Sequence, residues 1–299
     1  MDIMREKYDV PEKFVDKFLS GELLGQIRNG KTWDLVPGQT YDMFCNDCNH
    51  DECYRTEHNM LDLYPDENIK YTLNSDGYRC DEFNPDDVPH NFLFTGCSFT
   101  FGTGLPLKNV WSYTVNHNLG GYKYFNIGIN GATHRIIIAD IYRFIAKYGK
   151  PKAIMAFFPD LHRYENFTYM EEKPQVRIYS HTEHQTLGFD TLLTNEFILN
   201  DFYTLIMGLE QYLETIGVPF LWTSWVNATN EPLNKANLKN YFDFEKELFN
   251  VLLHHDLDKP DYIDMRFWDR ARDDHPSTRM NMAYAKMFEI QYNIKYGRR

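Results

Sequence analysis

Residues 91–104 read NFLFTGCSFTFGTG, and this stretch decides the fold. Its first part, Asn91–Thr95, is a short continuous apolar run, as expected for a strand that is covered on both faces. Its second part places three glycines around Ser98, which favours a tight exit from the strand. We therefore expect the Ser98 hydroxyl to stand where a buried strand ends.

The same texture recurs along the rest of the chain. Three further short apolar runs predict strands at Tyr122–Ile127, Ala153–Phe158 and Pro219–Thr223. Longer stretches between or after them predict helices at Ala132–Tyr148, Glu196–Ile216, Phe242–His255 and Ser277–Ile294. Strands that alternate with helices pair in parallel through right-handed crossovers. The sequence thus predicts an α/β protein, a three-layer α/β/α sandwich around a mostly parallel sheet.

Residues 1–90 have a different composition. They are polar, rich in Asp and Asn, and contain one amphipathic helix candidate, Pro11–Leu19. They end in a breaker-rich junction, Asn84–His90, which reads NPDDVPH. We expect an irregular, loop-rich N-terminal extension over residues 1–90 and the α/β domain over residues 91–299.

Composition limits the classes of function. Apolar residues make up 43% and charged residues 25% of the 299, an ordinary globular balance. The formal net charge of −12 repels nucleic-acid backbones and anionic membrane surfaces, so we expect neither as a partner. The first ten residues carry five charged side chains, and no apolar run approaches about 18 residues. We expect a cytoplasmic protein with neither signal peptide nor transmembrane segment.

Two further stretches carry candidate chemistry. The second predicted strand ends in NIGINGATH (126–134), where backbone N–H groups at a helix start can donate to a developing oxyanion. Before the last helix stands RDDHPS (272–277), where an Asp can orient the imidazole of His275. A serine is a poor nucleophile without such a base. Each stretch alone also fits an ordinary turn or a charged surface loop.

Taken together and in this order, GCSFTFGTG, NIGINGATH and RDDHPS resemble the conserved blocks of the SGNH/GDSL hydrolases, an esterase- and lipase-like family. The resemblance covers roughly residues 91–299. Upstream, NSDGYR (74–79) also resembles a segment that precedes the first block in some environmental and phage members. The resemblance implies a flavodoxin-like sandwich and a serine esterase that works through an acyl-enzyme without a cofactor.

The resemblance also implies roles for the matching residues. Ser98 would attack a carbonyl carbon, and His275 would take its proton and return it to the leaving alcohol. Asp273 would hold the imidazole, with Asp274 as the alternative. The backbone N–H groups of Ser98 and Gly131 would form part of the oxyanion hole.

The chain departs from the family pattern in three places. Cys97 stands before the serine where the family has Asp, and Asp273 precedes His275 by two positions instead of three. The third block, which supplies an Asn to the oxyanion hole, has no counterpart after AIMAFF. The loss of one such donor typically costs ~2.7–4 kcal/mol of transition-state stabilisation. We expect Arg163 or His162 to replace it, although both also fit a surface loop.

The substrate follows from family habit only. Many relatives remove acetyl groups from carbohydrates, so we expect a small-molecule or glycan ester, such as an acetylated sugar or a host surface glycan of a phage. The rival hypothesis is a catalytically inactive protein of this fold that binds glycan or forms part of a virion or homo-oligomer. A phosphate-binding domain is a weaker alternative, because the glycines lack the Lys-Ser/Thr ending of a P-loop.

The last candidate site comes from the cysteines, of which the chain has five. Their odd number and the absence of a signal peptide argue against a disulfide framework. Cys45, Cys48, Cys53 and Cys80 could provide the four ligands that structural zinc requires, although Cys80 is distant in sequence. Unlinked thiols packed in a loop-rich region are the alternative. Loss of bound metal in Cys48→Ser would identify the zinc site.

Overall fold

The computed structural model describes residues 38–42, 69–161, 163–170, 173–179, 195–225, 233–234, 236, 238–254, 275–276 and 278–297. A four-stranded sheet lies at the centre, with the strand order β4-β3-β5-β8 and parallel pairing throughout. Its strands are β3 (Phe92–Gly96), β4 (Phe125–Asn126), β5 (Ala153–Phe158) and β8 (Phe220–Ser224). The predicted parallel sheet is confirmed.

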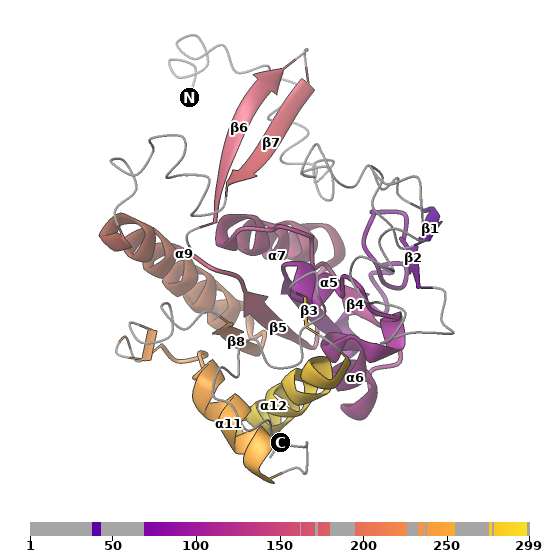
Figure 1. The fold of residues 1–299 in the computed structure, drawn as a ribbon, viewed down its shortest axis with the longest axis vertical. Coiled ribbons are helices and arrows are strands. Elements are labelled where there is room, and N and C mark those ends of the chain that lie inside the picture. The colour runs from indigo at the N-terminus through magenta and orange to yellow at the C-terminus, as the bar shows by residue number, and fades with distance from the viewer. Residues whose placement is uncertain are drawn as a thin grey trace.

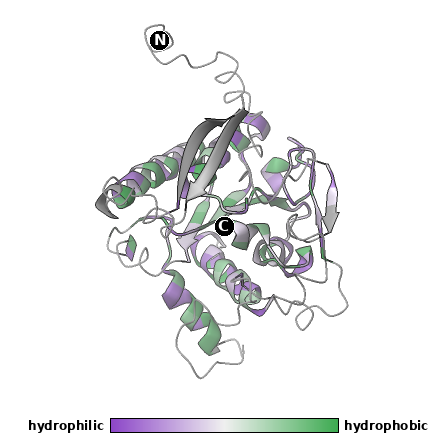
Figure 2. Cartoon of the chain, turned by 45° about the horizontal axis from the view of Figure 1, so that its top comes forward, coloured by the Kyte–Doolittle hydropathy of each residue, from purple (hydrophilic) through white to green (hydrophobic). Residues whose placement is uncertain are grey.

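Helices cover both faces of this sheet (Figure 1). On one face lie α7 (His134–Tyr148) and α9 (Asn195–Ile216), and on the other lie α6 (Trp111–Asn118), α11 (Phe244–His254) and α12 (Thr278–Tyr296). The three-layer α/β/α architecture predicted from the sequence is confirmed. Figure 2 shows that these helices carry hydrophobic and hydrophilic residues side by side, as helices between a core and solvent do. Within the described ranges, no helix has the length and apolarity to cross a membrane.

The core forms because the strands are apolar on both sides. Every residue of β3, β5 and β8 is buried. Helix α7 begins at His134 because the Thr133 side chain accepts a hydrogen bond from the Ile136 N–H, an N-cap. Its apolar stripe is buried as the spacing predicts, at Ile137, Ile141, Phe144 and Ile145.

The second strand is shorter than the predicted Tyr122–Ile127. Only Phe125 and Asn126 pair with β3. The preceding backbone is held by side chains instead: the Asn91 amide oxygen accepts from the N–H groups of Tyr122 and Lys123 at 3.1 and 2.9 Å. An edge strand can exchange ladder bonds for such side-chain bonds without leaving its N–H groups unpaired.

Several elements were not predicted from the sequence. A hairpin of β6 (Tyr164–Met170) and β7 (Lys173–Tyr179) follows β5 and extends beyond the layers in Figure 1. Helix α6 was also missed, because its apolar periodicity is weak and its burial depends on packing against α12. Before the sheet, β1 (Thr40–Asp42) pairs antiparallel with β2 (Lys70–Thr72).

Residues 69–90 contribute to the same core as the sheet. The Phe83 ring makes edge contacts with Phe125 and Phe144, at centroid distances of 5.4 and 5.1 Å. A short 3-10 helix, η1 (Val88–His90), then leads into β3. The division expected at residue 90 stays a prediction, because most of residues 1–68, including the candidate helix Pro11–Leu19, lies outside the described residues.

Candidate active site

Ser98 stands directly after the central strand β3, where it begins the four-residue helix α5 (Ser98–Phe101). The turn is tight, because a Cβ on Gly96 would lie 2.1 Å from Thr100 Oγ1 and 2.6 Å from the Phe157 carbonyl oxygen. Ser98 is 6% exposed, and its hydroxyl has Cys97 Sγ as its hydrogen-bond partner at 4.0 Å. The predicted nucleophile therefore lies at the carboxyl edge of the sheet, where sites of such folds form.

The backbone of Ser98 has a free donor. As the first residue of a helix its N–H has no intrahelical partner, and no acceptor for it is found among the described residues. The Ser98 carbonyl, in contrast, accepts from the N–H groups of Gly102 and Thr103 at 2.9 and 3.1 Å. The turn thus fixes the serine while leaving one N–H group available to an oxyanion.

The turn that contains Gly131 is joined to the Ser98 turn. Gly131 has a φ of 73°, in the left-handed region that favours glycine. Thr103 Oγ1 donates to Asn130 Oδ1 at 2.7 Å, and the Ile129 N–H donates to the Gly96 carbonyl at 3.1 Å. These bonds hold the ends of β3 and β4 together, so the two predicted oxyanion elements lie on neighbouring turns.

His275 lies beside the same turn. Its imidazole ring is edge-on to the ring of Phe99, the residue after Ser98, with centroids 6.0 Å apart. Between Ser98 and His275 themselves the structure shows no hydrogen bond. Catalytic hydrogen bonds are often long in the free enzyme and shorten only when substrate binds. Asp273 and Asp274, the two carboxylates predicted to orient the imidazole, lie outside the described residues.

The end of β5 brings Arg163 toward this group. Its guanidinium carbon is 5.7 Å from the ring centroid of Trp225, and Trp225 stacks on Phe99 with centroids 4.6 Å apart. Arg163 therefore belongs to the surroundings of the Ser98 turn, whereas His162 lies outside the described residues. Trp225 is not among the predicted site residues, although its position immediately after the fourth strand could have indicated it.

A second His–Asp pair lies between α7 and α9. His134 Nε2 is 3.2 Å from Asp201 Oδ2, and Arg135 binds the same carboxylate with two bonds of 2.9 and 2.7 Å. The hydrogen bond from His134, together with Arg135, lowers the pKa of Asp201. His134 is fully buried. This pair ties two helices together, and in the part of the chain that the structure describes it bonds no serine or cysteine side chain.

The described residues contain no group of three or more His, Cys, Asp or Glu side chains that could hold a metal ion. Three of the predicted zinc ligands, Cys45, Cys48 and Cys53, lie outside the described residues. Cys80 is described: its sulfur accepts from Asn74 Nδ2 at 3.5 Å, and burial raises the pKa of its thiol. The zinc site stays a prediction.

Known proteins give only distant likenesses. No protein-family model matches the chain, and no curated protein matches it. It is similar to a solved structure from Desulfitobacterium hafniense, described as a lipolytic protein of the G-D-S-L family, with 14% identity over 67% of this chain and 99% of that one and a TM-score of 0.39. A second such protein, from Veillonella parvula, has 14% identity over 70% of this chain and 98% of that one, with a TM-score of 0.38. At this distance the likeness says nothing about chemistry, which has to come from the residues of the site.

Proposed function

We propose that this protein is a serine hydrolase that cleaves an ester through an acyl-enzyme on Ser98. The observation that carries the proposal is the contact between the His275 ring and Phe99. It joins the loop before the last helix to the residue next to the predicted nucleophile. The two segments are far apart in the sequence, so their contact depends on the tertiary structure.

The reaction divides into two transfers. Ser98 Oγ forms a bond with the ester carbonyl carbon while His275 accepts the hydroxyl proton. The C–O bond to the alcohol then breaks, and His275 returns the proton to the leaving oxygen. In the second transfer water attacks the acyl-enzyme carbonyl while His275 accepts its proton, and the acid leaves as the proton returns to Ser98 Oγ. Asp273, or Asp274 in its place, orients the imidazole.

The negative charge that develops on the carbonyl oxygen needs donors. The unpaired Ser98 N–H supports a role for this residue, and the bonded turns support Gly131 as its neighbour. The missing Asn of the third block is replaced by a side chain from the loop after β5. Arg163 fits this role because it reaches Trp225 beside Phe99, and His162 is the alternative.

The stacked rings of Phe99 and Trp225 support a carbohydrate as the alcohol part of the ester. A sugar ring presents C–H groups that pack on an indole face, and Arg163 can donate to its oxygens. Ser98 is nearly covered by its surroundings, which favours a small acyl group such as acetyl. The substrate class we propose is therefore an acetylated sugar or glycan.

Two measurements test the proposal. Wild-type protein should react with a fluorophosphonate probe and hydrolyse p-nitrophenyl acetate, and Ser98→Ala should abolish both. Ser75→Ala is the matched control, because it removes an exposed hydroxyl that bonds Glu82 at 2.5 Å. Peptide mapping should find the phosphonate on Ser98. Wild-type protein that is neither labelled nor active, or hydrolysis that survives Ser98→Ala, contradicts the proposal.

Two observations favour a second candidate, a glycan-binding or virion-associated protein without turnover. The Ser98 hydroxyl bonds Cys97 rather than His275, and the third-block Asn is absent. Such a protein would bind acetylated glycan with equal affinity in wild type and Ser98→Ala and release no acetate from it. Calorimetric titration with acetylated oligosaccharides, together with acetate detection, separates the two.

A further inference from the structure

Arg79 is a buried cation that the proposed mechanism does not use. It lies between β2 and β3 and is 1% exposed. Burial lowers the pKa of Arg79, yet a guanidinium keeps its charge at neutral pH. A buried charge is costly unless hydrogen-bond acceptors surround it. The groups that bind the guanidinium therefore indicate which part of the fold the buried charge stabilises.

Four carbonyl oxygens surround the guanidinium. Nη1 donates to the carbonyls of Gly102 and Phe101 at 2.7 and 3.3 Å, and Nη2 donates to those of Leu105 and Lys70 at 2.7 and 3.3 Å. Three of these four carbonyls belong to the chain that leaves Ser98. Carbonyls at the end of a helix lack intrahelical partners, and Arg79 supplies a donor to that of Phe101 and a second donor to that of Gly102, which also accepts from the Leu105 N–H at 3.2 Å.

The same loop is held from a second direction. The guanidinium carbon of Arg79 lies 4.3 Å from the ring centroid of Tyr71, a cation–π contact. The Tyr71 hydroxyl in turn accepts a hydrogen bond from the Gly104 N–H at 2.9 Å. Tyr71 and Arg79 thus act on the same loop.

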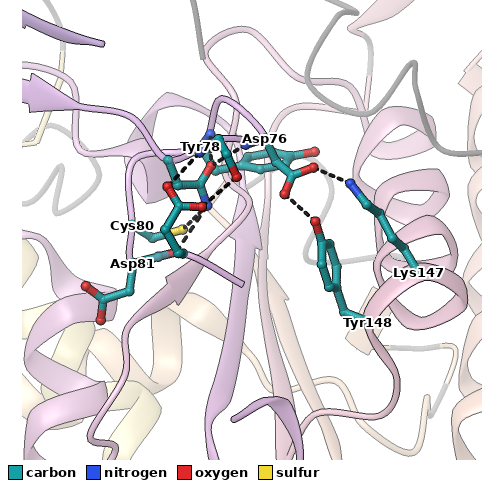
Figure 3. Close-up of polar contacts among 9 residues, drawn as sticks. Asp76, Tyr78, Cys80, Asp81, Lys147 and Tyr148 are labelled. Atoms are coloured by element: carbon teal, nitrogen blue, oxygen red, sulfur yellow. Dashed lines mark hydrogen bonds and ion pairs between the residues drawn. The ribbon is translucent and has the colours of Figure 1, made fainter. Parts of the chain in front are cut away.

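The turn that carries Arg79 is itself anchored to α7 (Figure 3). The Asn74 side chain accepts from the N–H groups of Asp76 and Tyr78 at 3.1 and 2.8 Å, which closes the turn. Asp76 then bonds Lys147 at 2.5 Å and also accepts from the Tyr148 hydroxyl. Arg79 therefore projects from a rigid support.

We propose that Arg79 is a positioning residue for the Ser98 nucleophile. The link is direct, because Gly102, whose carbonyl Arg79 binds, donates its own N–H to the Ser98 carbonyl. The chain is also closely packed at Gly102, since a Cβ there would lie 2.2 Å from the Val110 side chain. This inference rests on the proposed function of Ser98 and adds NSDGYR (74–79) to the parts that serve the site.

Lysine cannot replace arginine here. A guanidinium spreads its donors in a plane and meets several carbonyls at once, whereas an ammonium is a point donor on a flexible stem. Arg79→Lys should therefore keep the charge but let the Ser98 turn shift. A displacement of about 1 Å can cost ~100-fold in rate. We expect kcat to fall ~10- to 100-fold while KM stays within about twofold.

The experiment compares Arg79→Lys with Arg143→Lys. Arg143 is a second largely buried arginine, and it binds Asp140 within α7 at 2.8 Å. For both variants we would measure kcat and KM on p-nitrophenyl acetate, the fluorophosphonate labelling rate and the urea midpoint. Only Arg79→Lys should lower kcat and labelling together, even where both variants lose similar stability.

The outcomes separate this inference from the proposed function. If wild type is labelled and active and Arg79→Lys equals it, or if Arg143→Lys loses as much activity, the role of Arg79 is overturned. If wild-type protein is neither labelled nor active, the proposed function is overturned, and the role of Arg79 with it. If Arg79→Lys does not fold, Tyr71→Phe decides, because it removes the hydroxyl that accepts from the Gly104 N–H and keeps the ring beside Arg79. A lowered kcat at constant KM then supports the proposal, and wild-type kcat overturns it.

Discussion

The imidazole of His275 meets the ring of Phe99 edge-on, with ring planes at 68° and centroids 6.0 Å apart. Phe99 continues the chain from Ser98, so this contact brings the predicted base to the predicted nucleophile. The contact between His275 and Phe99 requires the loop before α12 to be held against the rest of the domain. The residues that hold this loop are therefore as testable as the pair itself.

Asn281 is one of the residues that hold the loop. Its amide donates to the Pro276 carbonyl at 3.2 Å and accepts from the Trp111 N–H at 3.0 Å, so it joins the His275 loop to the start of α6. Asn281→Ala should lower kcat ~10-fold, because the imidazole loses its fixed place. It should also destabilise the fold by about 1–3 kcal/mol through unpaired buried groups.

Asn118→Ala is the matched control for this change. Asn118 also joins α6 to α12, by a 2.6 Å bond to Glu289, but at an exposed position. Kinetics on p-nitrophenyl acetate and urea denaturation of both variants decide the matter. A wild-type kcat in Asn281→Ala would show that the loop is held by other contacts.

Trp225 should contribute to substrate affinity rather than to the chemical step. Its ring stacks on the buried ring of Phe99, the residue after Ser98, with planes at 25°. Trp225→Ala should raise KM for an acetylated sugar ~10-fold with less effect on p-nitrophenyl acetate, since in the proposed complex the indole meets the alcohol part. Tyr122→Ala, which removes an exposed ring that bonds Asp87, serves as the control. Equal KM increases for both substrates would argue against a sugar-binding role for Trp225.

Gly96 and Gly208 should respond to alanine in opposite ways. A Cβ at Gly96 would lie 2.6 Å from the Phe157 carbonyl oxygen, a backbone atom of β5 that cannot move aside. Gly96→Ala should cost about 3 kcal/mol or more and displace Ser98. Gly208 lies in α9 with open space around it, so Gly208→Ala should stabilise by about 1 kcal/mol. Urea denaturation measures both, and a tolerated Gly96→Ala would refute this account of the turn.

Asp140 should make stability depend on pH. Burial raises its pKa to about 6, although Arg143 and Tyr78 both donate to the carboxylate. A carboxyl whose pKa is higher in the folded than in the unfolded protein contributes stability below pH ~4, and this is lost as pH rises through about 6. The loss should reach about 3 kcal/mol by pH 7.

Asp140→Asn should remove this component of the pH dependence. The measurement is the free energy of unfolding in urea at pH 4.5 and 7.5 for wild type and variant. Asp86→Asn, at an exposed position, should leave the wild-type pH dependence in place. The prediction fails if Asp140→Asn and wild type lose the same stability between the two pH values.

The layers of the fold could be predicted because their signals are local. The six apolar residues of AIMAFF match β5 at both ends, and the stripe of α7 is buried as its spacing requires. Helix α6 carried no such signal. Its burial comes from contacts such as the stack of Trp111 on Phe288 of α12, at 4.3 Å, between residues far apart in sequence.

By itself the sequence determined the strands of the central sheet, most of the helices and the candidate residues, because hydrophobic period and glycine-rich exits act over a few residues. Only the tertiary structure decided which of those residues meet. The contact of His275 with Phe99 and the grip of Arg79 on the loop after Ser98 depend on how layers pack. Such packing reflects the summed burial of many side chains, and no single stretch of sequence encodes it.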